Sequence, residues 1–295
     1  MEKKAYTASF TSSQKTKTHT PCAKNIHITL CPMIVASRLN TIHLTIEMWL
    51  LALVAGTAGC AGCNAVTCYL DRDIDAIMTR TRNRPLPSGR IKPPQKALYF
   101  GLFLITLSLI LPLFRNLLSF TFMALGAFDN VIIYSLISKR RTPLNIILGG
   151  ISGGLPVAFG WSFVTNSISW TMIVMMALVM LWIPNHFWSL AVRFKEDYER
   201  ANVPMLPVVV EEKKTLKIIV STSIILVAFT ILPFFLNTFK LIYLATASIV
   251  GGAMLLLNLW LFFKPTKRNA WIVYKFTSPY LIIIFSAMII DVLLL

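Results

Sequence analysis

The chain has 295 residues, of which 56% are hydrophobic and only 14% are charged, and its mean hydropathy is +0.69. This composition excludes an ordinary water-soluble globular protein and is typical of a chain that crosses a membrane several times. The formal net charge of +16 is a feature of many nucleic-acid-binding proteins. Here the basic residues follow the apolar segments and form no domain of their own, so we expect no nucleic-acid partner.

Apolar segments recur along the whole chain at the length that a membrane-spanning helix needs. They cover residues 26–42, 46–70, 97–114, 118–137, 145–164, 170–192, 217–237, 241–263 and 274–295. The first is the weakest, because Pro32, Arg38 and Asn40 interrupt it. The alternating pattern of a membrane β-barrel is absent, which leaves helices as the spanning structure. The predicted fold is therefore all-α, a polytopic membrane helical bundle of about nine transmembrane helices.

The amino-terminal segment differs in composition from the rest of the chain. It is rich in Ser, Thr and Lys and poor in apolar residues. We expect residues 1–25 to form a basic, disordered arm and residues 26–295 to form one intramembrane domain. A transit peptide is the alternative for the arm, but Glu2 and the lack of arginine disfavour it.

The basic residues also predict how the bundle is oriented. With nine spans and the amino terminus inside, every Lys and Arg falls on the inner side except Arg38, Arg115 and Lys240. Such an excess is typical of cytoplasmic loops. We therefore expect a multi-pass protein of the plasma membrane, with its charged loops and its amino terminus in the cytoplasm. The mitochondrial inner membrane is the alternative location.

A cluster of acidic and basic residues directly follows the predicted 46–70 span. Asp71 and Asp75 are four residues apart, so on a helix they share one face, while Asp73 points away. Arg80 and Arg84 repeat this spacing on the next segment. Carboxylates bind Mg²⁺ together with phosphate oxygens, and arginines bind phosphates through paired hydrogen bonds. The cluster predicts a site for a metal-bound diphosphate, and a solvated loop with internal ion pairs is the alternative.

A second charged patch closes the predicted 170–192 span and falls on the same side of the membrane. Its residues are Arg193, Lys195, Glu196, Asp197, Tyr198 and Glu199. Two such patches at one end of a helical bundle suit a diphosphate bridged by metals, with its apolar tail between the helices. His186, near the end of this span, is a candidate to bind a metal, act as a base or hydrogen-bond a neighbouring helix.

Two further acids lie inside predicted spans, where ionisable residues are uncommon. We interpret Asp129, in the middle of the 118–137 segment, as a hydrogen-bonded contact between helices. Asp291, in the last segment, is expected at the outer membrane interface.

Several of these strings resemble those of the UbiA superfamily of intramembrane prenyltransferases. Asp71-Arg-Asp-Ile-Asp75 with Arg80-Thr-Arg-Asn-Arg-Pro85 resembles the first aspartate motif of that family. Lys139-Arg-Arg-Thr-Pro143 and Val203-Pro-Met-Leu-Pro207 are similar to strings of its heme-farnesylating branch, the protoheme IX farnesyltransferases or heme O synthases. The resemblance runs from about residue 46 to the carboxyl terminus.

The resemblance implies a reaction in which a farnesyl group passes from farnesyl diphosphate to a vinyl group of heme B, giving heme O for terminal oxidases. The carboxylates that it implies as Mg²⁺ ligands are Asp71, Asp75 and Asp197. The basic residues that would neutralise the departing diphosphate are Arg80, Arg84, Lys139 and Arg140. Further substrate-binding positions would be Asn64, Thr67, Tyr134, Arg141, His186, Arg193, Lys195 and Tyr198.

The chain departs from the family pattern at two positions. Thr67 stands where the family usually has an asparagine, although Asn64 lies one turn earlier. Ala201 stands where relatives with aromatic substrates tend to have a second aspartate, which fits the heme branch. Prenylation of an aromatic quinone precursor or of a lipid is the alternative activity, and a transporter of a phosphorylated solute is a second one, although we find no inverted repeats. Expected partners are the lipid bilayer and heme A synthase or terminal oxidase assembly proteins.

Overall fold

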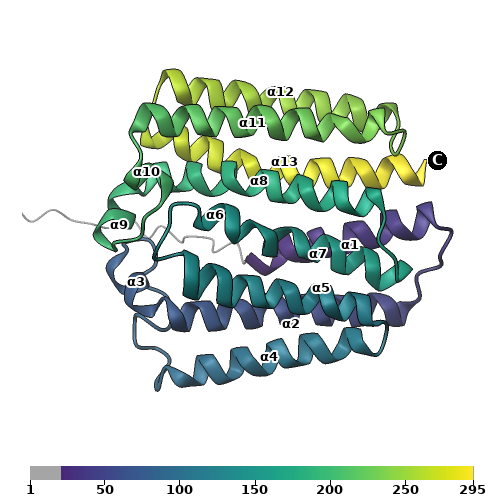
Figure 1. Cartoon of the computed structure of the whole chain (residues 1–295), viewed down its shortest axis with the longest axis horizontal. Coiled ribbons are helices and arrows are strands. Elements are labelled where there is room, and N and C mark those ends of the chain that lie inside the picture. The colour runs from purple at the N-terminus through teal and green to yellow at the C-terminus, as the bar shows by residue number, and fades with distance from the viewer. Residues whose placement is uncertain (1–20, 295) are drawn as a thin grey trace, which may run out of the picture.

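The computed structural model describes residues 21–294, and all regular elements among these residues are helices (Figure 1). Eight helical segments are long and apolar enough to cross a membrane, and the first helix contributes a shorter apolar stretch, His27–Leu39. The predicted all-α membrane bundle is therefore confirmed.

The long helices agree closely with the predicted spans. They are α1 (Pro21–Leu39), α2 (Ile46–Leu70), α4 (Gln95–Leu113), α5 (Leu117–Phe128) with its continuation η1 (Asp129–Ser138), α7 (Gly150–Thr165), α8 (Trp170–Arg193), α11 (Glu212–Phe235), α12 (Leu241–Phe263) and α13 (Lys267–Leu293). Short helices join them, namely α3 (Arg72–Ile77), α6 (Asn145–Leu148), α9 (Lys195–Arg200) and α10 (Leu206–Val209). The last span begins earlier than predicted because the Thr266 hydroxyl caps α13 by accepting the N–H of Asn269 (3.1 Å).

The weak first segment is a helix, and Pro32 lies inside α1 without ending it. Met33, Val35 and Ala36 in this helix are fully buried. The helix begins at Pro21, within the predicted arm at 1–25, and residues 1–20 of that arm lie outside the described residues. The α1 helix therefore belongs to the packed bundle.

Small residues set the closest contacts between helices. At Gly160 on α7, an added Cβ would lie 2.1 Å from the carbonyl oxygen of Thr29 on α1. At Gly62 on α2, it would lie 2.8 Å from the carbonyl oxygen of Gly101 on α4. Helices in a membrane associate through such close packing, because lipid tails supply no hydrophobic force between them.

The charged segments gather at one end of the bundle. Figure 1 shows α3, α9 and α10 at the left end, whereas the carboxyl terminus lies at the right end. Asp291 lies in the last turn of α13, and its carboxylate accepts the N–H groups of Lys240 and Tyr243 and so caps the start of α12. Among the spans, α7 and α8 have the largest share of buried residues in their apolar windows. The share is smallest in α4 and α5, so these two helices face the lipid.

The contact between α1 and α7 makes a direct prediction about stability. We expect Gly160→Ala to destabilise the protein by about 1–3 kcal/mol, because a methyl group would press on the backbone of Thr29. The matched control is Gly252→Ala, since nothing lies within 4 Å of a Cβ at that position. Thermal unfolding of the purified protein in detergent measures both, and equal stability of the two variants would contradict the packing described.

Candidate active site

The first aspartate motif lies at a break between two helices. Asp71 ends α2, with its N–H bonded to the carbonyl of Thr67 (2.9 Å), and α3 begins at the next residue. Asp71 and Asp75 are each only 4% exposed, whereas the side chain of Asp73 is 60% exposed. The four-residue spacing therefore puts Asp71 and Asp75 on the inner face, as the sequence predicts, and turns Asp73 outward.

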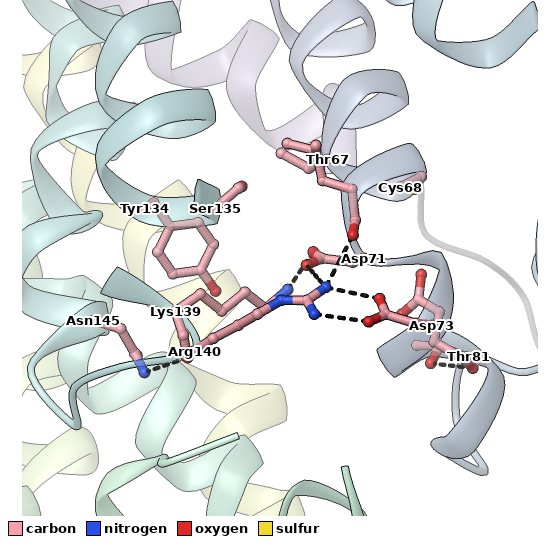
Figure 2. Close-up of polar contacts among 12 residues, drawn as sticks. Thr67, Cys68, Asp71, Asp73, Thr81, Tyr134, Ser135, Lys139, Arg140 and Asn145 are labelled. Atoms are coloured by element: carbon pink, nitrogen blue, oxygen red, sulfur yellow. Dashed lines mark hydrogen bonds and ion pairs between the residues drawn. The ribbon is translucent and has the colours of Figure 1, made fainter. Parts of the chain in front are cut away.

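Each inner aspartate is paired with a basic residue, one from a distant segment and one from the same motif. Lys139, at the end of η1, forms an ion pair with Oδ2 of Asp71. Arg84 donates from Nη1 to Oδ2 of Asp75 at 2.7 Å. Arg140 grips Asp73 with two hydrogen bonds of 2.7 Å each, and Figure 2 shows Lys139 and Arg140 reaching together toward the end of α2.

The charges at this site stabilise one another. Burial disfavours the ammonium of Lys139, but its contacts with Tyr134 and Asp71 outweigh burial and raise the pKa of Lys139. Burial likewise disfavours the guanidinium of Arg84, yet the Asp75 carboxylate raises the pKa of Arg84. The hydrogen bonds from Arg140 lower the pKa of Asp73 to about 2. The carboxylates therefore favour the charged forms of Lys139 and Arg84, and Arg140 favours the ionised form of Asp73.

The position of Lys139 depends on an unusual helix. From Asp129 to Ser138 the chain forms a π-helix, η1. In its last turn the N–H of Lys139 donates to the carbonyl of Tyr134, five residues earlier (2.9 Å). In an α-helix, residues five apart point about 140° away from each other. The wider π turn reduces this angle, and the Lys139 Nζ lies 5.6 Å from the centre of the Tyr134 ring.

Contacts with the neighbouring helix accompany this π-helix. The Asp129 carboxylate accepts the N–H of Ser152 on α7 (2.8 Å), which is the helix contact predicted for Asp129. Tyr134 lies against Gly149, where a Cβ would meet the Tyr134 ring at 2.4 Å. Sequence reasoning missed the π-helix, because its hydrogen-bond register has no counterpart in the hydrophobic pattern.

The second charged patch meets the first through Asp197. This buried carboxylate accepts a hydrogen bond from the Thr79 hydroxyl (2.5 Å) and another from Arg200. Burial alone would raise the pKa of Asp197, but these two hydrogen bonds outweigh it and lower that pKa. Thr79 was not among the predicted site residues, and nothing in its local sequence distinguishes it. The two patches thus border the same end of the bundle, as predicted.

The arginines after α3 do not share a helical face, contrary to the spacing argument. Residues 78–89 form a series of turns and no helix, so Arg80 and Arg84 diverge. Arg84 turns to Asp75, whereas the Arg80 guanidinium lies 5.9 Å from the centre of the Phe194 ring. Arg80 therefore faces the second patch.

An aromatic column runs along α8 and α13 beside the second patch. His186 is stacked between Trp182 and Tyr274, with ring centres 4.4 Å and 4.6 Å away. Its Nδ1 lies 2.5 Å from the Thr277 hydroxyl, so of the three predicted roles the contact between helices is the one present. Trp271 stacks on Tyr274 at 5.1 Å and continues the column toward the charged end.

The remaining predicted residues surround this end of the bundle. Arg193 lies 5.0 Å above the Trp271 ring and donates to the carbonyl of Lys267 (3.1 Å). Tyr198 is buried, Lys195 is half-buried and Arg141 is exposed. Among the described residues, none of these three side chains forms an ion pair or hydrogen bond with Asp71 or Asp75.

A cavity inside the bundle lies below the first motif. Asn64 lines it two helical turns from Asp71, together with Cys60 and Cys63 of α2 and side chains from α1, α5, η1 and α7. The hydroxyl of Thr67 turns back to the carbonyl of Asn64 (3.1 Å). The Thr67 hydroxyl therefore donates its hydrogen bond within α2.

The acidic residues supply only some of the ligands that a metal ion needs. No three His, Cys, Asp or Glu side chains between residues 21 and 294 are grouped closely enough to form a ready-made metal site. Asp71 and Asp75 share a face, while Asp197 is engaged by Thr79 and Arg200. The Oδ1 atom of Asp71 is buried without a hydrogen bond. Such a pair suits Mg²⁺, which commonly binds one or two carboxylates plus phosphate oxygens.

Comparisons with known proteins agree with these motifs. Residues 28–280 match the UbiA prenyltransferase family. The chain is 48% identical over 246 residues to protoheme IX farnesyltransferase of Desulforudis audaxviator, covering 83% of this chain and 78% of that protein. It is 46% identical over 254 residues to protoheme IX farnesyltransferase of Thermoplasma volcanium, covering 85% and 88%.

Solved structures show the same fold. A digeranylgeranylglyceryl phosphate synthase has a TM-score of 0.75 at 23% identity, with 93% of this chain and 96% of that one covered. An apo UbiA homolog from Aeropyrum pernix K1 has a TM-score of 0.72 at 18% identity, with 91% and 98% covered. A UbiA homolog from Archaeoglobus fulgidus bound to DMAPP and Mg²⁺ has a TM-score of 0.60 at 17% identity, with 90% and 96% covered.

The buried ion pair between Lys139 and Asp71 makes a testable prediction. We expect Lys139→Gln to destabilise the protein by about 3 kcal/mol, because it leaves the buried Asp71 with only the distant Arg140, 4.0 Å away, as a cation. Adding Asp71→Asn to that variant should restore part of the stability. Arg140→Gln is the comparison variant, since its pair with Asp73 is largely exposed and its contact with Asp71 is long, and it should cost about 1 kcal/mol. Equal unfolding midpoints for Lys139→Gln and Arg140→Gln would show that the pair is unimportant.

Proposed function

The chain belongs to the UbiA prenyltransferase family, and we propose that it transfers a farnesyl group from farnesyl diphosphate to heme B, giving heme O for terminal oxidases. One observation carries this proposal. The face formed by Asp71 and Asp75 meets Lys139 of the Lys-Arg-Arg-Thr-Pro string. Relatives that are 46–48% identical to this chain are protoheme IX farnesyltransferases, which supports the same acceptor.

The donor diphosphate binds at the charged end of the bundle. Asp71 and Asp75 would hold Mg²⁺ through their carboxylates, and Asp197 would complete the site from the second patch. Bound Mg²⁺ would supply the positive charge that helps the diphosphate to leave. Lys139 and Arg84 already lie on these carboxylates and turn toward the phosphate oxygens when the donor binds. Arg80 and Arg140 add positive charge where negative charge develops.

The farnesyl chain extends between the helices below Asp71, and these helices move apart to take it, because the cavity that Asn64 lines holds only about 90 Å³. Breaking the bond between carbon and oxygen sends the electron pair out with the diphosphate and leaves an allylic cation. The apolar walls of the cavity keep water away from this cation. The vinyl group of heme B then supplies two electrons and forms the new carbon–carbon bond. Water adds to the resulting cation and loses a proton, so each turnover consumes one water and releases one diphosphate.

The aromatic column favours a planar acceptor that carries carboxylates. Trp271 and Tyr274 present stacked rings that are half-buried. Arg193 and Lys275 both lie over the Trp271 ring, at 5.0 Å and 5.3 Å. A heme has a flat aromatic ring system and two propionates, so it can pack against the edges of such rings while its propionates pair with such cations. A small aromatic acid would use little of this surface.

The orientation follows from the basic residues at the end that carries α3 and α9. This end faces the cytoplasm of the cell, in the plasma membrane, and residues 26–295 form the catalytic domain. The mitochondrial inner membrane is the alternative location. Heme O made here passes to heme A synthase or to terminal oxidase assembly proteins.

The decisive experiment supplies both types of acceptor. Membranes containing the protein receive farnesyl diphosphate, Mg²⁺ and either heme B or 4-hydroxybenzoate, and pigments are extracted and analysed by mass spectrometry. We expect heme O from the first mixture and no prenylated acid from the second. Product from the aromatic acid alone would overturn the heme assignment.

Variants of the first motif test the roles of its three aspartates. We expect Asp71→Ala and Asp75→Ala to lower heme O formation at least 100-fold, because both carboxylates hold the metal diphosphate. Asp73→Asn is the matched control, since Asp73 points outward, and it should retain activity within about threefold. Removal of Mg²⁺ by a chelator should abolish the product. Normal activity in Asp71→Ala, with the protein inserted at wild-type level, would refute the metal role.

A further inference from the structure

A second cavity, of about 460 Å³, lies between α2 and α4 at the charged end of the bundle. Ala65 and Cys68 line it from α2, and Ala97 and Phe100 line it from α4. Asn64 of α2 and Lys96 of α4 also line it, and Arg84 with the turns that follow it supplies the rest. None of the lining residues comes from η1, α7, α8 or α13, so the cavity is separate from Lys139 and the aromatic column.

The cavity exists because α2 and α4 separate at this end. They touch closely at Gly62 and Gly101, where only glycine fits. Nearer the charged end the facing residues are Ala65 and Ala97, whose small side chains leave a gap. Phe100 lines the cavity and is also 59% exposed on the lipid-facing side of α4. The gap is therefore accessible from the bilayer.

The lining is apolar except at its rim, where the charge is positive. Arg84 and Lys96 both line the cavity, and its lining includes no aspartate or glutamate. Lys96 is exposed and has no ion-pair partner within residues 21–294. An apolar chamber with two cations at its rim matches a molecule with an apolar chain and an anionic head.

We propose that this cavity binds an anionic phospholipid of the surrounding leaflet, with an acyl chain between α2 and α4 and its phosphate at Lys96 and Arg84. A phospholipid fits better than a soluble anion because nearly all of the lining is apolar and the opening faces lipid. The cavity shares Arg84 and Asn64 with the proposed donor site, but neither Asp71 nor Lys139 lines it, so lipid binding can be measured apart from the reaction.

The same guanidinium connects the lipid to the active site. Arg84 donates to Asp75 from Nη1 at 2.7 Å, and its other N–H groups remain free to bind a phosphate. A bound anionic lipid therefore holds Arg84, and the turns around it, next to Asp75. The composition of the leaflet thereby influences how Asp75 is presented to the donor.

Lipid binding can be measured without any turnover. The purified full-length protein in phosphatidylcholine nanodiscs is titrated with phosphatidylglycerol, and the bound lipid is counted by native mass spectrometry. We expect Lys96→Gln to weaken phosphatidylglycerol binding about fivefold and Lys96→Arg to retain it. Ala97→Trp should block the acyl chain. The matched control, Lys214→Gln, removes an exposed lysine at the same end of the bundle and should leave binding unchanged.

Three outcomes would overturn the proposal. Unchanged phosphatidylglycerol binding in both Lys96→Gln and Ala97→Trp would show that the lipid binds elsewhere. Equal binding of phosphatidylcholine would show that the rim charges select nothing. Displacement of the lipid by farnesyl thiolodiphosphate, but not by glycerol phosphate, would assign the cavity to the prenyl donor. Because Ala97→Trp can fail to fold, the Lys96 pair of variants decides the result if that protein does not insert.

Discussion

The structure of the charged end depends on the pairing of two buried carboxylates with cations, one from a distant helix end and one from the turns of the same motif. Asp71 pairs with Lys139, and Asp75 pairs with Arg84. A lone buried carboxylate at the edge of a membrane would lose its charge or destabilise the fold, because burial in an apolar environment disfavours ionised groups. Pairing offsets the cost of burying both carboxylates, and the same cations are then available to a diphosphate.

These pairs require helices that are positioned accurately. Lys139 reaches Asp71 because η1 widens the helical turn, beside the bond between Asp129 and Ser152. Close packing at Gly62 and Gly160 fixes the helices around the site. The parts of the fold that lie far from the charged end therefore determine where the charges meet.

The sequence predicts the features that depend on local pattern. Apolar segments gave the spans, and the four-residue spacing gave the shared face of Asp71 and Asp75. Contacts between distant segments could not be predicted in this way, because periodicity carries no information about partners. The bond from Thr79 to Asp197 joins residues 118 positions apart. The π-helix and the cavity beside Ala97 depend equally on packing between helices, so they too had no signal in the chain.

We propose that the protein supplies only part of a metal site and that the diphosphate completes it. The most direct test is a titration of the purified protein with Mg²⁺, with and without the unreactive donor farnesyl thiolodiphosphate. We expect weak Mg²⁺ binding to the protein alone and binding at least tenfold tighter with the analogue, a gain that Asp71→Asn removes. Tight Mg²⁺ binding without any diphosphate, unaffected by Asp71→Asn, would contradict it.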